Sequence, residues 1–482
     1  MIPMTLGEIA AAVGGRLHRA TGDEVVSGTV EFDSREIGAG GLFVAVPGER
    51  VDGHDFAAKA VAAGAVGVLA ARQVDAPAVL VPPVADAHRR SVALTGDTDG
   101  SGAAVLGGLG ALAHEVADRL NAGGLTIVGV TGSSGKTSTK DLMAQLLEPM
   151  GETVAPPGSF NNELGHPWTV LRATAATRYL VLELSARGPG HIAALCRTAR
   201  PRIGVVLNVG SAHLGEFGSR EGIARTKGEL VEALPSDGLA VLNADDPIVA
   251  AMAARTEARV VLVGQSAGAD LRATDIELDA EARAGFRIGG PSGPVVQLGL
   301  HGAHQVGNAL ACAAVAVELG ARLEEVAQRL SAARRRSGRR MELRTRADGV
   351  TVVNDSYNAN PESMSAALRT LAALAGGRRR SWAVLGIMAE LGESSEAAHA
   401  EIGRLAVDLG VDRLIVVGEP AAAMLAEVEN KEAVLVPDVD AAVALLRAEL
   451  RPEDVVLVKA SKVAALWRVA EALLAGRDGG VA

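Results

Sequence analysis

The chain is poor in cysteine and in aromatic residues. Its 482 residues include two cysteines, and Phe, Trp and Tyr together make up 2%. Cys196 and Cys312 both lie in apolar, helix-like stretches, so buried free thiols are expected rather than a disulfide or a metal pair. With so few aromatic side chains, the sequence offers no stacking platform for single-stranded nucleic acid.

Long apolar runs are absent as well. No run reaches the length of a membrane span, and the N-terminus lacks the basic and then apolar pattern of a secretory signal. We therefore expect a cytoplasmic protein without a membrane span. The formal net charge of −10 argues against general nucleic-acid binding. The basic clusters at 334–336 and 378–380 are predicted to be solvated helix ends or linkers.

The length favours about three domains. Residues 1–122 mix short strands and helices, with a polar surface excursion expected at 82–102. Residues 123–335 alternate strands with helices, which is the pattern of a parallel sheet. A second alternation over 336–482 predicts a separate doubly wound domain. The predicted fold class is α/β in three domains.

The expected strands of the two larger domains are short runs that are apolar on both faces, as buried parallel strands should be. The central ones are Leu125–Val130, Tyr179–Leu184, Ile203–Asn208, Leu239–Asn243 and Val260–Val263. The C-terminal ones are Thr351–Asn354, Trp382–Leu385, Arg413–Val417, Ala433–Val436 and Val455–Lys459. A short meander is expected over Asp270–Leu300, and helices over Leu106–Leu120 and His304–Leu319.

A Gly/Ser loop follows the first central strand and precedes a helix. In this loop, Gly132-Ser-Ser-Gly-Lys-Thr137, the glycines let backbone N–H groups turn toward an anion at the helix N-terminus. Lys136 is placed to reach the outer phosphates of ATP, and Thr137 to bind Mg²⁺. Val130 stands where the common phosphate loop has glycine, so the loop is a tighter form. A ligand-free turn is the alternative, but the order of strand, loop, Lys-Thr and helix favours a phosphate site.

Two further residues suit metal or phosphate chemistry, and a third does not stand out from its spacing. Glu183 ends a strand, where a carboxylate either faces solvent or holds Mg²⁺ beside a phosphate loop. His213 follows the next strand, at the sheet edge where open α/β folds bind ligands. Lys227 lies on an amphipathic helix, and its spacing alone indicates a solvated surface charge.

Other polar segments follow strands or open helices. Asn243-Ala-Asp-Asp-Pro247 caps the next helix or touches nucleotide. His304 and Asn308 open a helix, where each could simply be a cap. Asn354–Ser363 is a short loop dense in polar side chains and holds one of the two tyrosines, which favours a binding site over a plain turn.

Together these motifs resemble the Mur ligase family of ATP-dependent amide-forming enzymes. The resemblance covers nearly the whole chain, although 82–102 has no counterpart. It implies a UDP-muramoyl-peptide-binding domain at 1–122, an ATP-binding domain at 123–335, and a Rossmann-like domain at 336–482 that binds D-Ala-D-Ala. The implied ATP loop consists of Thr131, Gly132, Ser133, Ser134, Gly135, Lys136, Thr137 and Ser138.

The resemblance also assigns roles to individual residues. Ser34 and Arg35, within Asp33-Ser-Arg35, would contact the UDP-sugar end of the substrate. Asn161 and Asn162 would line the substrate channel. Two Mg²⁺ ions would be held by Thr137, Glu183, His213 and Lys227, the lysine being a carbamate formed with CO₂. The implied catalytic residues are Lys136, Glu183, His213 and Lys227.

The remaining implied contacts lie near the boundary between the central and C-terminal domains. Those to ATP are Asn308, Arg340 and Asp355, and those to substrate are Tyr357, Asn358 and Asn360. Two positions depart from the family pattern: Gln305 replaces an asparagine in the adenine-side motif, and Ile387 stands where an acid is usual.

Within the family, the loop Asp355–Pro361 resembles ligases that add D-Ala-D-Ala to UDP-MurNAc-tripeptide through an acyl phosphate. We expect such an enzyme, active as a monomer. Alternatives are a ligase that adds the third peptide residue, a folylpolyglutamate-type ligase, a P-loop kinase or regulatory nucleotide-binding protein, and a non-catalytic homologue.

Overall fold

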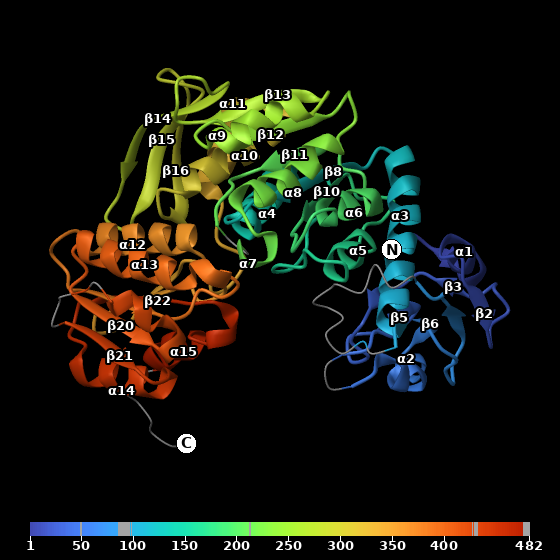
Figure 1. The fold of residues 1–482 in the computed structure, drawn as a ribbon. Coiled ribbons are helices and arrows are strands. Elements are labelled where there is room, and N and C mark those ends of the chain that lie inside the picture. Colours follow the sequence, from blue (N-terminus) through green and yellow to red (C-terminus); the bar gives the residue numbers. More distant parts are fainter. Residues whose placement is uncertain are drawn as a thin grey trace.

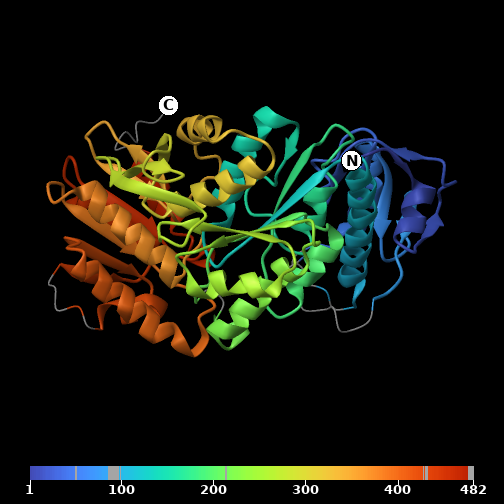
Figure 2. The ribbon, with the colours of Figure 1, turned by 90° about the horizontal axis from the view of Figure 1, so that it is seen from above.

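The computed structural model describes residues 1–48, 51–84, 97, 99–211, 214–426, 428 and 432–475. Three sheets follow one another along the chain, together with a two-stranded pair near the N-terminus. In Figure 1 the central part forms the top of an arch, and the N-terminal and C-terminal parts lie below it on opposite sides. Seen from above, the three parts form one elongated row (Figure 2).

The N-terminal part is a five-stranded sheet in the order β2-β7-β6-β5-β4, with helices on both faces. Capping of α1 is local: the Thr5 side chain accepts from Glu8 N, and the Glu8 carboxylate accepts from Thr5 N. The elements are β1 (Met4–Thr5), α1 (Leu6–Ala12), β2 (Arg16–His18), β3 (Val25–Val26), β4 (Val30–Glu31), β5 (Gly41–Val44), α2 (Ala57–Ala62), β6 (Ala65–Ala70) and β7 (Ala78–Leu80).

A nine-stranded sheet in the order β16-β15-β14-β13-β12-β11-β8-β10-β9 makes up the central part. Its strands are β8 (Thr126–Thr131), β9 (Thr153–Val154), β10 (Tyr179–Glu183), β11 (Ile203–Val206), β12 (Leu239–Asn243), β13 (Arg259–Gly264), β14 (Leu271–Leu278), β15 (Arg283–Ile288) and β16 (Val295–His301). The strands from β9 to β14 pair in parallel, and β14, β15 and β16 form the expected antiparallel meander.

Helices cover both faces of this sheet, so its parallel strands are buried on both sides. On one face lie α4 (Lys136–Leu147), α10 (Gln305–Glu318) and α11 (Leu323–Ala332). On the other lie α5 (Gly165–Val170), α6 (His191–Thr198), α8 (Arg220–Glu232) and α9 (Pro247–Ala250). The short α7 (Leu214–Phe217) precedes α8.

The C-terminal part is a six-stranded sheet in the order β17-β18-β22-β19-β20-β21, parallel except for β17. Its strands are β17 (Glu342–Thr345), β18 (Thr351–Asn354), β19 (Ser381–Leu385), β20 (Arg413–Val417), β21 (Ala433–Val436) and β22 (Val455–Lys459). The helices α12 (Pro361–Ala375) and α13 (Ser395–Asp408) cover one face, and α14 (Val439–Glu449) and α15 (Trp467–Leu474) cover the other, which makes the sheet doubly wound.

One long helix, α3 (Ser101–Ala122), connects the N-terminal and central sheets. Val105, Leu109 and Val116 on this helix belong to one apolar cluster that also contains Leu42 of β5 and Leu180 of β10. The two sheets therefore share a continuous core, and α3 is part of it along its length.

The α/β class and the alternation of strands with helices are confirmed. In the two larger sheets, the strands β9 and β17 were not predicted, because both are short, partly exposed edge strands without an apolar run. The helix expected from Leu106 begins at Ser101, inside the predicted excursion; 85–96 and 98 of that excursion lie outside the described residues. Among the described helices, none combines the length and apolar character needed to cross a bilayer.

Both cysteines are buried and free, as predicted. Burial raises the pKa of the Cys196 thiol to about 12. The basic cluster after α11 lies in a linker, as expected. Arg380, in the other cluster, is not a solvated helix end: it pairs with the buried Asp454 and stacks on the Trp382 ring.

Candidate nucleotide and metal site

The phosphate loop lies at the centre of the large sheet. It follows β8, whose neighbours are β10 on one side and β11 on the other. Gly135 has φ +82, and a Cβ there would lie 2.9 Å from Asn308 Oδ1 on α10. Glycine therefore suits both the left-handed turn and the close approach to α10. The N-terminus of α4 follows at once, so backbone N–H groups and the helix dipole face the same point.

Asn208, just beyond β11, holds the loop in shape. Its Oδ1 accepts from Ser134 N at 2.9 Å, and its Nδ2 donates to Ser134 O at 3.2 Å. Ser133 N donates to Asn208 O at 3.1 Å, and Ser133 Oγ accepts from Gly210 N at 2.9 Å. Asn208 was not among the predicted site residues, whereas His213 was, although the position of Asn208 after a strand adjoining β8 was a usable signal.

Lys136 folds back over its own loop. Its Nζ donates to Gly132 O at 2.7 Å. Burial lowers the pKa of Lys136, the nearby Arg340 lowers it further, and the Glu183 carboxylate opposes both effects. A phosphate that binds in the loop would therefore have to replace only the contact between the Lys136 ammonium and Gly132 O.

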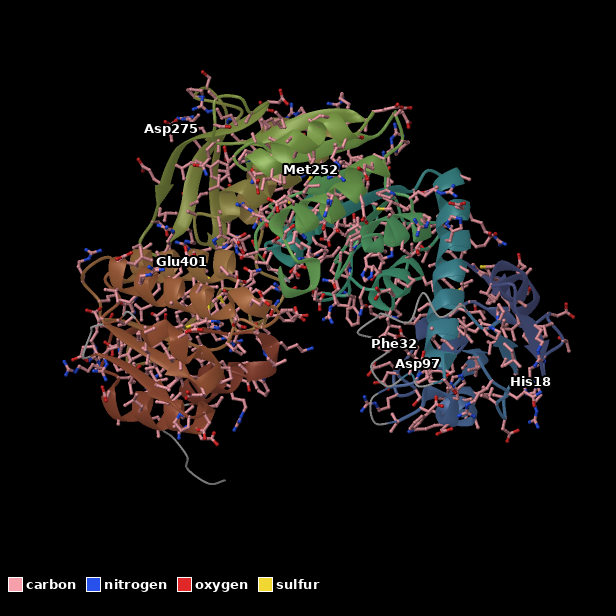
Figure 3. All side chains as sticks on the ribbon, viewed as in Figure 1. His18, Phe32, Asp97, Met252, Asp275 and Glu401 are labelled. Carbon is pink, nitrogen blue, oxygen red and sulfur yellow. The ribbon has the colours of Figure 1, made fainter. Side chains whose placement is uncertain are left out.

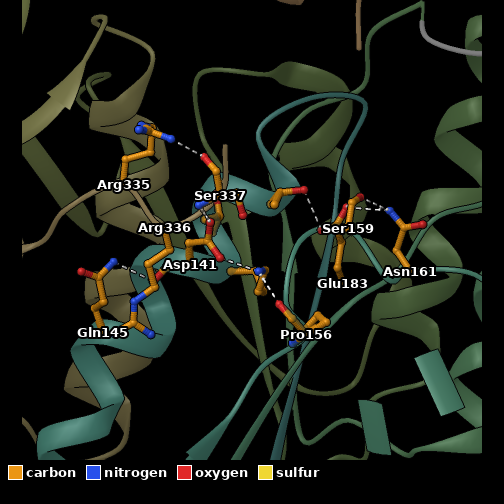
Figure 4. Close-up of polar contacts among 12 residues, drawn as sticks. Asp141, Gln145, Pro156, Ser159, Asn161, Glu183, Arg335, Arg336 and Ser337 are labelled. Carbon is orange, nitrogen blue, oxygen red and sulfur yellow. Dashed lines mark hydrogen bonds and ion pairs between the residues drawn. The ribbon is translucent and has the colours of Figure 1, made fainter. Parts of the chain in front are cut away.

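Glu183 meets Thr137 at the mouth of the loop. Thr137 Oγ1 donates to Glu183 Oε2 at 2.8 Å, while Glu183 Oε1 accepts from Asn161 Nδ2 at 2.7 Å and from Ser159 Oγ at 3.1 Å. Figure 4 shows Asn161 and Ser159 beside the carboxylate. Glu183 is 1% exposed, which excludes the solvent-facing alternative. A hydroxyl and a carboxylate are the hard oxygen donors that Mg²⁺ prefers, so these residues fit a magnesium site.

Lys227 is buried, at 7% exposure, and is not the surface charge that its spacing indicated. Burial, followed by repulsion from Lys136, holds the pKa of Lys227 well below its usual range. On the same helix, Gly228 leaves room for the Arg255 guanidinium, which donates to Ala224 O and Arg225 O. Lys136 lies close enough to Glu183 and to Lys227 for its charge to interact with both side chains.

The loop after β18 reaches the phosphate loop from the C-terminal sheet. Asn360 caps α12 through its Oδ1, and its Nδ2 donates to Ser133 O at 3.2 Å. The loop is held from its own sheet by Lys459, which pairs with Asp355 and donates to Asn358 O at 3.0 Å. The Asp355 carboxylate also accepts from Met341 N at 2.9 Å.

Two cavities are lined by residues of both the central and the C-terminal part. One of about 490 Å³ lies between α4, the 155–158 segment and the C-terminal part, and Arg340 and Tyr357 both line it. The Arg340 guanidinium lies 4.1 Å from the Tyr357 ring centroid, and its buried Nε has no partner among the described residues. A smaller cavity of about 80 Å³ brings Ser138 and Gln305 beside Arg340. Gln305 Oε1 accepts from Asn308 Nδ2 at 2.9 Å, so the residue that departs from the family pattern braces the expected adenine contact.

Ser34 and Arg35 lie on the N-terminal part. Arg35 is exposed and forms a two-pronged ion pair with Asp33. Among the described residues, no hydrogen bond or ion pair joins them to the phosphate loop. Their neighbour Phe32 stacks edge-on against Trp168 at 5.8 Å and approaches Phe160 at 6.3 Å. Figure 3 places Phe32 on the side of the N-terminal part that is nearer the central part. Phe160 directly precedes Asn161, so the aromatic contact joins the two segments.

Some expected site residues have local roles or cannot be placed. Asn162 Oδ1 accepts from Gly165 N at 2.9 Å, which fixes the start of α5. Thr131 Oγ1 donates to Leu184 O at 3.0 Å, which ties β8 to the end of β10. The Asn358 side chain is exposed. Expected metal ligand His213 lies outside the described residues.

A phosphate loop at the switch point of a parallel sheet, with a carboxylate and a buried lysine beside it, defines a nucleotide-binding α/β protein built for phosphoryl chemistry. Three family descriptions match successive parts of the chain: "Mur ligase family, catalytic domain" at residues 28–93, "Mur ligase middle domain" at 130–316, and "Mur ligase, glutamate ligase domain" at 339–462.

Known proteins resemble the chain over its whole length. A UDP-N-acetylmuramoyl-tripeptide–D-alanyl-D-alanine ligase of Mycobacterium tuberculosis (strain H37Rv) is 57% identical over 98% of both chains. A crystal structure of MurF from Acinetobacter baumannii aligns with TM-score 0.83 and 30% identity, covering 98% of this chain and 99% of that one. MurF ligase from Thermotoga maritima in complex with ADP aligns with TM-score 0.77 and 32% identity, covering 93% and 98%. The chain belongs to the Mur ligase family.

Proposed function

We propose that this chain is the ATP-dependent ligase that joins D-alanyl-D-alanine to UDP-MurNAc-tripeptide, releasing ADP and phosphate. The product, a UDP-MurNAc-pentapeptide, is a precursor of peptidoglycan. The observation that carries the proposal is the 57% identity to a ligase of that name over 98% of both chains. The loop Asp355–Pro361 is the segment that resembles ligases specific for D-Ala-D-Ala. Its residue Asn360 contacts the phosphate loop, which supports a place for the dipeptide beside ATP.

The three sheets divide the substrates among them. We assign residues 1–122 to the UDP-sugar end through Ser34 and Arg35, 123–335 to ATP, and 336–482 to the dipeptide through Tyr357, Asn358 and Asn360. Asn161 supports this division, because it lies between the aromatic contact to the N-terminal part and the Glu183 carboxylate.

The reaction has two steps. In the first, an oxygen of the tripeptide's terminal carboxylate attacks the γ-phosphorus of ATP, the bond to the bridging oxygen breaks, and ADP leaves. In the second, the dipeptide amine attacks the carbonyl carbon of the acyl phosphate, loses a proton, and phosphate leaves from the tetrahedral intermediate. The main barrier is the approach of a carboxylate to an anionic phosphate. The Lys136 ammonium and the N-terminus of α4 are placed to offset this repulsion.

Two magnesium ions would neutralise further phosphate charge. Thr137 and Glu183 would hold the first, because their oxygens already converge beside the loop. Following the family pattern, His213 and Lys227 would hold the second, with Lys227 carbamylated by CO₂. Its amine nitrogen attacks the carbon of CO₂ and loses a proton, which requires the neutral amine. The depressed pKa of buried Lys227 favours that form.

Phosphate release with each substrate omitted in turn tests the function. We expect release only when ATP, Mg²⁺, UDP-MurNAc-tripeptide and D-Ala-D-Ala are all present, together with a UDP-MurNAc-pentapeptide product. Release without the dipeptide would indicate a kinase or a regulatory nucleotide-binding protein instead. Release with a single amino acid would indicate a ligase acting elsewhere in the peptide or on folate.

We also propose that the enzyme works as a cytoplasmic monomer. Its nucleotide-linked substrate, ATP and two free buried thiols suit a reduced compartment. Light scattering of the full chain with and without nucleotide measures its mass. A dimer under both conditions would contradict the monomer.

A further inference from the structure

One face of the phosphate-loop helix α4 holds the linker that leads to the C-terminal sheet. Asp141, Gln145 and Glu148, on and just after α4, are spaced at helical intervals along this face. Asp141 Oδ2 accepts from Ser337 N at 3.1 Å. Gln145 donates to Arg334 O at 2.9 Å and accepts from Arg334 N at 3.0 Å. Glu148 forms a two-pronged pair with Arg336.

Lys140 precedes Asp141 on α4, and its side chain is directed into the protein interior. It is 1% exposed, pairs with Asp141, and donates to Pro156 O at 2.7 Å. The segment from Pro156 continues within a few residues to Ser159 and Asn161, which donate to Glu183. Figure 4 shows the contacts of Ser337, Asp141 and Pro156 as one group, and those of Ser159 and Asn161 with Glu183 as a second group beside it.

We propose that Lys140 and Asp141 are a positioning pair that couples the position of the interdomain linker to the geometry of Glu183. The inference rests on the proposed function only in treating Glu183 as the carboxylate of the nucleotide's metal site. Through Asp141 the pair holds the linker, and through Lys140 it holds the segment that orients the Glu183 carboxylate. One turn earlier on the same helix, Thr137 contacts Glu183 directly. Linker, phosphate loop and carboxylate are thus fixed to a single rigid element.

The coupling depends on the burial of the charged Lys140 side chain. A buried ammonium is costly without its counter-charge, so Lys140 has to stay with Asp141 and the Pro156 carbonyl together. Movement of the linker that pulls on Asp141 therefore also moves the 156–161 segment. A salt bridge on the surface, such as Arg336–Glu148, is half-exposed and imposes no such requirement.

Calorimetric binding of ADP to the full-length protein at a series of Mg²⁺ concentrations measures this coupling without turnover. Asp141→Asn is compared with Glu148→Gln, since each changes a carboxylate on the same face of α4 to its amide. We expect Asp141→Asn to raise the Mg²⁺ concentration needed for half-maximal ADP binding about tenfold. Glu148→Gln should change it by less than about twofold. ADP binding in the absence of Mg²⁺ should stay unchanged in both.

A double variant separates coupling from simple stability. Lys140→Met with Asp141→Leu replaces the buried pair by apolar side chains of similar size, which commonly restores folding stability. We expect this variant to match the wild-type melting temperature or exceed it, while the raised Mg²⁺ requirement remains. A wild-type Mg²⁺ requirement in the double variant, or equal shifts in Asp141→Asn and Glu148→Gln, would overturn the proposal.

Small-angle scattering measures whether the linker changes the arrangement of the domains when nucleotide binds. Adding ADP and Mg²⁺ to the wild type should reduce the radius of gyration, and Asp141→Asn should show a smaller reduction at equal nucleotide saturation. An unchanged reduction would contradict a role for the linker. Dipeptide-dependent phosphate release by the wild type is recorded separately, so failure of the proposed function and failure of this inference give different results.

Discussion

Asn360 Nδ2 lies 3.2 Å from Ser133 O and donates to it, which joins the C-terminal sheet to the phosphate loop. The same side chain caps α12 through its other atom, since Oδ1 accepts from Ser363 N at 2.9 Å. One amide therefore fixes a helix start and an interdomain contact at once. Any displacement of α12 relative to the phosphate loop has to break this hydrogen bond.

Asn360→Asp should separate the two roles. A carboxylate caps a helix as well as an amide does, so the free energy of unfolding should change by less than about 0.5 kcal/mol. The donor to Ser133 is lost, and two oxygens then face each other, so kcat should fall about tenfold. Urea unfolding and phosphate release measure the two effects. Equal kcat in the variant and the wild type would show that the contact is irrelevant to turnover.

Lys136→Ala should reduce turnover by on the order of a thousandfold, because no other described cation contacts the phosphate loop so directly. Lys136→Arg serves as the control for charge. The guanidinium is bulkier and planar, so we expect it to recover only a small part of the activity. Phosphate release at saturating substrates gives kcat. Substantial activity in Lys136→Ala would remove this residue from the phosphoryl-transfer step.

Lys227→Ala should be inactive and should regain part of its activity when a short carboxylate such as acetate is added. The small acid can occupy the space of the missing carbamate, whereas added amines should have no effect. The wild type should lose activity when CO₂ is removed and recover it with bicarbonate, because the depressed pKa raises the fraction of neutral amine that can react with CO₂. Full activity in Lys227→Ala would rule out the carbamate.

Arg35→Ala should weaken binding of the UDP-linked substrate and leave the chemistry alone. Arg35 is exposed and held by Asp33, far along the chain from the phosphate loop. Losing one charged contact to the substrate should raise its KM about tenfold or more, with kcat and the KM for ATP unchanged. Arg19→Ala, at another exposed ion pair of the N-terminal part, is the matched control. Similar effects of both variants would indicate a general charge effect.

His166 should make stability fall on the acid side. It is fully buried in α5, and neither ring nitrogen has a partner among the described residues. Burial lowers the pKa of His166 from 6.5 to about 3. As the pH falls below 6.5, His166 is protonated in the unfolded chain but stays neutral in the folded one. Its contribution to the free energy of unfolding is therefore fully present above pH 6.5 and declines toward pH 3. The loss between pH 7 and pH 5 should be about 2 kcal/mol.

Urea unfolding at the two pH values measures that decline, and His166→Leu provides the comparison. With no ring to titrate, the leucine variant should show a decline smaller by about 2 kcal/mol. An identical decline in both proteins would show that other groups control the acid behaviour.

Much of the fold followed from the sequence because buried parallel strands have a simple signature. The bounds expected for β12, β18, β20, β21 and β22 match the structure. The strand β17, with the sequence Glu-Leu-Arg-Thr, has no such signature; it becomes a strand only because β18 offers an antiparallel edge. Tertiary pairing, rather than local propensity, decides such elements.

The site was predictable where motif and strand end coincide, and less so where burial decides. Glu183 ends the strand β10 and lies beside the phosphate loop, as expected. Lys227 could not be distinguished from a surface lysine by helical spacing, and the resemblance to the Mur ligase family, which is confirmed, drew attention to it. Lys140 and Asp141 resemble an ordinary surface charge pair in the sequence. Only the packing of α4 shows that the lysine is buried.

The shared core around α3 constrains how this protein can diverge. Leu109 and Val116 belong to the one apolar cluster that the five-stranded and nine-stranded sheets share, so the two sheets must accumulate compensating changes together. Except for Ala282 of the central meander, the buried apolar clusters of the C-terminal sheet consist of its own residues, and this sheet escapes the constraint. A chimera that exchanges residues from β17 onward with a distant relative should therefore fold more readily than one that exchanges the N-terminal sheet without α3.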